Sequence, residues 1–195
     1  SDVCSSDLGQ FCFCWCNLTI DLISSESEEF LGFVQQSLDC RLVQTTNAAC
    51  YLSLKENVLS FHSQNFKNPL TLDPTKGQLG YRLKRSEQEG LLKKALGNLK
   101  PGSVIVDATA GLLKDSLIFN SFGFRVIAIE QSKILGTILK VSQKANAKLS
   151  SIDLRIGQSE NMLPQLNADV IYFDPMFEKE GSALRERNLR LIKEI

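Results

Sequence analysis

The strongest constraint on the fold is a regular alternation of strand and helix patterns that begins near Lys100. Four short runs rich in β-branched residues are separated by segments in which apolar residues recur at helical spacing. The runs are "SVIVDA", "RVIAIE", "IDLRIGQ" and "ADVIYFDP". Strands joined through helices of this length form right-handed βαβ units. We therefore predict an α/β fold, with a parallel sheet covered by helices on both faces.

The part of the chain before Lys100 has a different pattern. Residues 9–75 are predicted to form a small α+β lobe: a strand at "FCFCW", a helix over "SSESEEFLGFVQQSL" capped by Ser24 or Ser25, and a hairpin of "CYLSLK" and "VLSFHS" joined at "KEN". Residues 76–100 are predicted to be a basic joint and a helix. The joint falls in "PTKGQLGYRLKR", and the helix "SEQEGLLKKALG" carries a capping box from Ser86 to Glu89.

The two ends of the sequence look artificial. The opening "SDVCSSDL" resembles the translation of a sequencing-adapter remnant, so residues 1–8 are expected not to belong to the natural protein. The last residues, "RLIKEI", keep helical spacing without a C-cap glycine. We therefore expect residues 101–195 to be a truncated domain.

Composition and charge narrow the class of protein. A hydrophobic fraction of 43%, with no apolar run of membrane-spanning length, predicts a soluble, cytoplasmic protein. Cysteines alternate in "FCFCWCN" instead of pairing at zinc-ligand spacing, and His62 is the only histidine, so no metal site is expected. Residues 76–100 are basic, and Arg82, Lys84 and Arg85 are candidate contacts to a polyanion. From charge alone, a solvated helix face is the stronger alternative.

Polar residues stand where the predicted strands end. Asp107, Glu130, Gln158 to Glu160 and Asp174 each follow a strand, and ligands of open α/β sheets bind beyond these ends. In "DATAGLLKD", Gly111 lets backbone amides approach a ligand closely, but the phosphate-binding glycine patterns are absent. Glu130 could accept both hydroxyls of a ribose. Together these residues predict a nucleoside pocket without pyrophosphate recognition.

The motif "DPMF" resembles the [DNS]-P-P-[YF] motif of amino methyltransferases that use S-adenosylmethionine. In such enzymes the acidic side chain and the carbonyl after it accept the hydrogens of a planar amine, while the aromatic ring stacks on the base. By this resemblance Asp174, Pro175 and Phe177 are the candidate catalytic residues. The same motif also serves DNA adenine and protein glutamine methyltransferases, which stay open as alternatives.

The pair of "DATAG" and "DPMF" is similar to the ribosomal RNA small subunit methyltransferase J family. That resemblance implies a Rossmann-like class I methyltransferase sheet, incomplete at the C-terminus, with a small N-terminal α+β lobe. It also implies S-adenosylmethionine as cofactor, 16S ribosomal RNA or the small ribosomal subunit as partner, and methylation of a guanosine at N2. The implied cofactor contacts are Asp107, Gly111, Lys114, Asp115, Glu130, Gln131, Ser159, Glu160 and Asp174.

The sequence departs from that family at three positions. Leu113 and Lys114 stand where glycine and arginine are usual, and Glu178 replaces a proline. These departures leave a second hypothesis open, in which the chain is an RNA-binding module that keeps the fold without catalysis.

Overall fold

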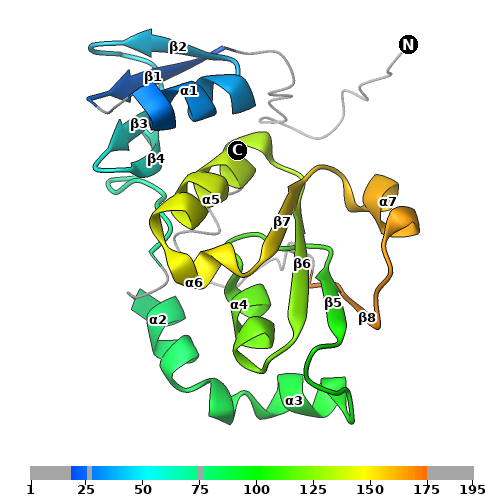
Figure 1. Cartoon of the computed structure of the whole chain (residues 1–195). Coiled ribbons are helices and arrows are strands. Elements are labelled where there is room, and N and C mark those ends of the chain that lie inside the picture. The colour runs from blue at the N-terminus through cyan, green and yellow to red at the C-terminus, as the bar shows by residue number, and fades with distance from the viewer. Residues whose placement is uncertain (1–18, 26–27, 74–76, 175–195) are drawn as a thin grey trace, which may run out of the picture.

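The structure is a computed structural model that describes residues 19–25, 28–73 and 77–174. Its first sheet has four strands in the order β2-β1-β3-β4 (Figure 1). The elements are β1 (Ile20–Ser24), α1 (Glu28–Ser37), β2 (Cys40–Val43), β3 (Cys50–Lys55) and β4 (Val58–Ser63). Strand β1 runs parallel to β2 and β3, and β3 and β4 form an antiparallel hairpin.

The predicted hairpin is confirmed. Glu56 and Asn57 have φ angles of 51° and 60°, as a two-residue turn of type I′ requires. The predicted strand "FCFCW" lies outside the described residues. Ser24 belongs to β1, so its prediction as the N-cap of the first helix is wrong.

The predicted joint is largely helical. It contains α2 (Gly77–Lys84), which is followed by a 3₁₀ turn, η2 (Ser86–Gln88), and α3 (Gly90–Leu96). Helix α2 forms despite its glycines because Leu79 is buried and α2 packs against α4. The predicted capping box is wrong: Glu89 precedes α3 without a side-chain cap, and its carboxylate accepts a hydrogen bond from Arg82 instead.

The second sheet confirms the predicted parallel α/β fold. Its four strands are parallel in the order β7-β6-β5-β8. The elements are β5 (Val104–Asp107), α4 (Lys114–Ser121), β6 (Arg125–Glu130), α5 (Lys133–Ala145), α6 (Ala147–Ser150), β7 (Asp153–Ile156), α7 (Ser159–Met162), η3 (Leu163–Gln165) and β8 (Val170–Tyr172). The helical segment expected between the second and third strand runs is interrupted at Asn146, whose extended backbone ends α5 and whose side chain caps α6.

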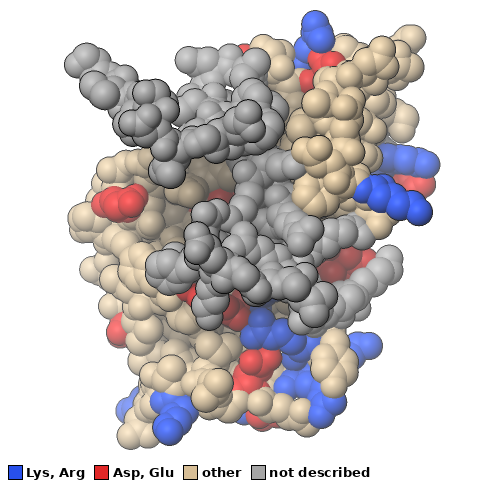
Figure 2. All heavy atoms as spheres, turned by 180° about the vertical axis from the view of Figure 1, so that it is seen from behind, with Lys and Arg blue, Asp and Glu red and all other residues tan. Residues whose placement is uncertain are grey.

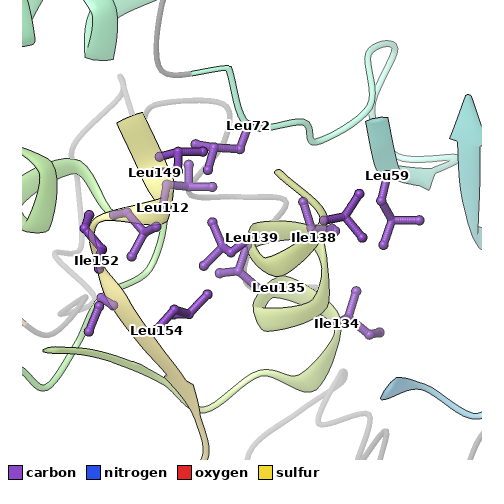
Figure 3. Close-up of a cluster of buried hydrophobic side chains, with 14 of the residues drawn as sticks. Leu59, Leu72, Leu112, Ile134, Leu135, Ile138, Leu139, Leu149, Ile152 and Leu154 are labelled. Carbon is purple, nitrogen blue, oxygen red and sulfur yellow. The ribbon is translucent and has the colours of Figure 1, made fainter. Parts of the chain in front are cut away.

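Helix α5 joins the two sheets into one hydrophobic core. Figure 3 shows Leu139 turned toward the β7 side of the helix and Ile138 turned toward Leu59 of β4. These three side chains are fully buried. Helix α1 also contacts α5, where the Lys144 ammonium lies 4.6 Å from the ring centroid of Phe33. The same helix therefore fixes the position of the first sheet relative to the second.

No helix in the described ranges is long and apolar enough to cross a membrane.

The tight contact between α5 and β7 generates a prediction. A Cβ atom at Gly136 would lie 2.6 Å from Cγ1 of Ile156, closer than real contacts allow. We expect Gly136→Ala to lower the free energy of unfolding by about 1–3 kcal/mol through overpacking, as measured by urea denaturation.

The matched control is Gly32→Ala in α1, where nothing lies within 4 Å of the added Cβ. This substitution should stabilise the protein by about 0.5–1 kcal/mol through helix propensity. Equal effects of the two substitutions would contradict the packing described for α5.

Candidate functional site

The carboxyl ends of the parallel strands bring the predicted strand-end residues to one edge of the second sheet. Asp107 ends β5, Glu130 ends β6, and Asp174 is the second residue after β8. Ser159 and Glu160 begin α7 directly after the loop that follows β7. Strand β5 lies between β6 and β8, so the chain leaves β5 where the strand order reverses direction, which is the usual place for a ligand in such sheets.

Asp107 organises the loop that follows β5. Its side chain is 2% exposed, and both carboxylate oxygens are bound within the chain. Oδ1 accepts the Thr109 N–H at 3.1 Å, and Oδ2 accepts the Ser116 hydroxyl of α4 at 2.6 Å. Burial raises the pKa of Asp107 to about 6, and the hydrogen bonds from Ser116 and Thr109 oppose that rise. Asp107 therefore holds both ends of the loop.

Glu130 meets this loop from the neighbouring strand. The residue is 8% exposed, and its carboxylate accepts the Gly111 N–H at 3.0 Å and the Ser132 N–H at 2.7 Å. Burial raises its pKa, against the effect of these hydrogen bonds. The Gly111 amide, which was expected to approach a ligand, thus positions a carboxylate.

The surroundings of Glu130 fit a ribose. Its carboxylate offers about four lone-pair sites. The amides of Gly111, Ser132 and Gln131 act on it, which leaves acceptor capacity for a ribose hydroxyl. Gly111 has a φ angle of 49°, and a Cβ placed there would have no heavy atom nearer than Thr109 O at 3.9 Å. The loop is therefore open on the side of Gly111 where a side chain would stand.

Leu113 adopts an unusual backbone conformation at the start of α4. It precedes the first helical residue with φ 57° and ψ 21°, a left-handed conformation that costs a residue with a side chain about 1–2 kcal/mol. Its side chain is fully buried. Leu113, which stands where glycine is usual in the similar family, thus adopts a left-handed conformation with its side chain packed in the core.

The first turn of α4 carries Asp115, whose two oxygens bind other elements. Oδ1 accepts Nη2 of Arg82 from α2 at 2.9 Å, and Oδ2 accepts the Tyr172 hydroxyl from β8 at 3.0 Å. Asp115 was predicted as a cofactor contact, whereas its pairing with Arg82 and Tyr172 was not predicted. They lie 33 and 57 residues away in sequence, so no local pattern identifies them.

Asp174 is held through its backbone. Its N–H donates to Thr109 Oγ1 at 2.8 Å. Beside this bond, the N–H of Ala108 donates to the carbonyl oxygen of Tyr172 at 3.0 Å. The loop after β5 and the start of "DPMF" are therefore tied together. Pro175 and Phe177 lie outside the described residues, and Asp174 itself is exposed.

The basic candidates on and beside α2 differ in their surroundings. Arg82 is half-buried and paired with Glu89 and Asp115, whose hydrogen bonds, that of Glu89 first, raise its pKa further above its usual range. Lys84 and Arg85 are exposed, and the Arg85 guanidinium lies 5.2 Å from the ring centroid of Tyr81. Figure 2 shows basic side chains gathered at this end of the molecule, at lower right, with acidic ones interleaved.

The remaining predicted contacts also lie near this edge. Lys114 begins α4, Gln131 directly follows β6 and is exposed, Ser159 is half-buried, and Glu160 is exposed. The structure therefore brings the predicted cofactor residues to the carboxyl edge, and it adds Thr109, Ser116 and Tyr172 as hydrogen-bond partners that the sequence did not reveal.

The raised pKa of Asp107 generates a prediction of pH dependence. Its pKa is about 6 in the folded chain against 3.8 ordinarily, so wild-type stability is lost as the pH rises through this window. Asp107→Asn cannot ionise. We expect the free energy of unfolding of the variant, relative to wild type, to increase by about 1 kcal/mol from about pH 5 to about pH 8.

Urea denaturation at both pH values measures this difference. Both proteins contain Glu130, but the charge of Asp107 contributes to the raised pKa of Glu130, so the measured difference includes this coupling between the two carboxyls. A difference that does not change with pH would show that Asp107 titrates normally.

Three kinds of comparison connect this geometry to known proteins. The chain is similar to the ribosomal RNA small subunit methyltransferases J of Rhodopseudomonas palustris strain HaA2 (33% identity over 141 residues, 66% of this chain) and of Nitrosococcus oceani (32% over 158 residues, 73% of this chain). It spans 64% and 61% of the lengths of these relatives. The homologue from Brucella anthropi is 34% identical over 137 residues, which cover 65% of this chain and 67% of the relative.

A solved structure shares the fold. It is a SAM-dependent methyltransferase from Neisseria gonorrhoeae, which superposes with a TM-score of 0.65 at 22% identity over 80% of this chain and 70% of that chain. A family model described as "Putative SAM-dependent methyltransferase" matches residues 35–195, which include the whole carboxyl edge described above. The chain therefore belongs to this family of S-adenosylmethionine-dependent methyltransferases, and S-adenosylmethionine is its cofactor.

Proposed function

We propose that this protein transfers a methyl group from S-adenosylmethionine to the exocyclic N2 of a guanosine in small-subunit ribosomal RNA, the guanosine at position 1516 of 16S RNA. The names of its relatives support an RNA of the small ribosomal subunit as substrate. The observation that carries the proposal is the hydrogen bond of 2.8 Å from the Asp174 amide to Thr109. It places the acid of "DPMF" beside the loop that positions Glu130.

On the cofactor side, carboxylates dominate the site. Asp115 and Asp174 both raise the pKa of Asp107, after the larger effect of burial, which means that the three acids share one electrostatic environment. Such a region favours a cationic ligand over an anionic one. Bound S-adenosylmethionine supplies a methyl group already activated on a sulfonium cation. Glu130 is proposed to hold the ribose hydroxyls, and Gly111 leaves the space to reach them.

On the substrate side, Asp174 is proposed to accept a hydrogen of the guanine amine. The lone pair of an aryl amine is delocalised into the ring, so the amine is a poor nucleophile. Two acceptors, the Asp174 carboxylate and the backbone carbonyl after it, would favour the pyramidal geometry that attack on a methyl group needs. Phe177 is proposed to stack on the guanine once the base is turned out of the RNA.

RNA is proposed to reach the site past α2. Lys84 and Arg85 are exposed there beside Tyr81, a combination that suits phosphate contact and stacking. Arg82 was predicted with them, but its guanidinium is paired with Glu89 and Asp115. We therefore assign phosphate contact to Lys84 and Arg85. Arg82 is assigned a structural role, in which it holds α2 to α4 through its ion pair with Asp115.

The role of Asp174 generates the central functional prediction. In the full-length protein, Asp174→Ala should lower methyl transfer by about a hundredfold or more, because it removes an acceptor that acts in the transition state. Mass spectrometry of nucleosides from digested small-subunit RNA detects N2-methylguanosine directly. S-adenosylmethionine affinity, measured by calorimetry, should change far less than turnover.

The control is Asp153→Ala, which removes an exposed carboxylate of β7 that pairs with Arg155. Its turnover should match wild type. Unchanged turnover of Asp174→Ala would contradict the role of Asp174 as an acceptor for the guanine amine. A wild-type protein that binds RNA without methylating it would favour the non-catalytic module, and a methylated adenine in DNA or glutamine in protein would favour the other amino methyltransferases.

A further inference from the structure

Asp115 lies at the junction of three elements that are distant in sequence. It belongs to the first turn of α4, and its two oxygens receive donors from α2 and β8. The resemblance to relatives implies only a cofactor contact for this residue. The hydrogen bonds to Arg82 and Tyr172 show that its carboxylate also has a structural use.

The Arg82 side of this junction is rigid. Its Nε donates to Glu89 Oε1 at 2.8 Å and its Nη2 donates to Glu89 Oε2 at 3.2 Å, while Nη2 also reaches Asp115 Oδ1 at 2.9 Å. The three side chains are between 19% and 27% exposed, so water screens these charges less than on an open surface. Two carboxylates therefore hold one guanidinium in a fixed plane.

The Tyr172 side leads to the proposed catalytic residue. The Tyr172 hydroxyl donates to Asp115 Oδ2, and its ring packs edge-to-face on Phe119 of α4, with centroids 5.0 Å apart. Strand β8 is only three residues long and lies at the end of the described strand order. Asp174 follows Tyr172 by two residues, so the Tyr172 side chain is the last one that fixes the strand before Asp174.

We propose that Tyr172 is a positioning residue for Asp174, that it acts through Asp115, and that Arg82 completes the arrangement by fixing Asp115. This inference rests on the proposed function and deepens it. It connects α2, which carries Lys84, to the strand that ends at Asp174. The proposed RNA contacts on α2 and the methyl-accepting site are then held in a fixed relative position by the hydrogen bonds of Asp115.

The test uses Tyr172→Phe in the full-length protein, which removes one hydroxyl and keeps the ring packed on Phe119. A hydrogen bond to a charged group supports a loss of kcat of about tenfold to a hundredfold. The Kd for S-adenosylmethionine should change by less than about threefold, because Asp115 keeps its position through Arg82. Hydrogen exchange at the Asp174 amide should accelerate, since the strand end is released.

A second variant, Arg82→Lys, keeps the positive charge but loses the planar fork. It should also lower kcat, and its effect combined with Tyr172→Phe should be smaller than the product of the two single effects, because both act through Asp115. Two controls remove comparable groups elsewhere: Ser121→Ala at the far end of α4, and Arg125→Gln at the opposite edge of the sheet. Both controls should retain wild-type kcat.

The outcomes separate the two proposals. Wild-type kcat in Tyr172→Phe, or a kcat loss matched by an equal loss of S-adenosylmethionine affinity, would overturn the positioning role. If the wild-type protein yields no N2-methylguanosine, the proposed function fails. The exchange rate of the Asp174 amide then still decides whether Tyr172 holds this strand end, and an unchanged rate in Tyr172→Phe overturns the inference.

Discussion

Burial of the Asp107 carboxylate is the constraint on which the site depends. A carboxylate that is 2% exposed must find hydrogen-bond donors inside the chain, and Asp107 finds them in Thr109 and Ser116. These two bonds fix the loop after β5 at both ends. Once the loop is fixed, the Gly111 amide can meet Glu130 and the Thr109 hydroxyl can receive the Asp174 amide. Burial of the Asp107 carboxylate thus lowers the stability of the fold somewhat, but it holds the ends of β5, β6 and β8 together through this loop.

The rest of the molecule supports this edge from outside. Helix α5 packs on β6 and β7 and also on β4 and α1, so the first sheet cannot move independently of the second without opening the shared core. Helix α2 packs against α4 with Leu79 buried in the core, and the pair of Arg82 and Asp115 joins the same two helices. Both attachments bring surfaces from the first hundred residues next to a site built from the later ones.

The sequence predicted the features that depend on local patterns. Apolar runs such as "VIVD" and "VIAIE" predicted the four parallel strands. The positions of Glu130 and Asp174 at the carboxyl edge were predicted because each residue follows such a run. Features set by distant contacts were missed. Helix α2 was interpreted as a joint because its glycines and the preceding proline are typical of turns, whereas the packing of Leu79 decides its structure. The partners of Asp115 could not be inferred, since 33 and 57 residues separate them from it.

The most direct test of the site is isothermal titration of S-adenosylmethionine into the full-length protein and its Glu130→Ala variant. The matched control is Asp169→Ala, because Asp169 also accepts a backbone amide with its carboxylate, but at the opposite edge of the same sheet. We predict that Glu130→Ala weakens binding by about tenfold to a hundredfold, the effect of lost hydrogen bonds to a charged group, and that Asp169→Ala binds like wild type. Equal affinity in all three folded proteins would contradict the assignment of the carboxyl edge as the cofactor site.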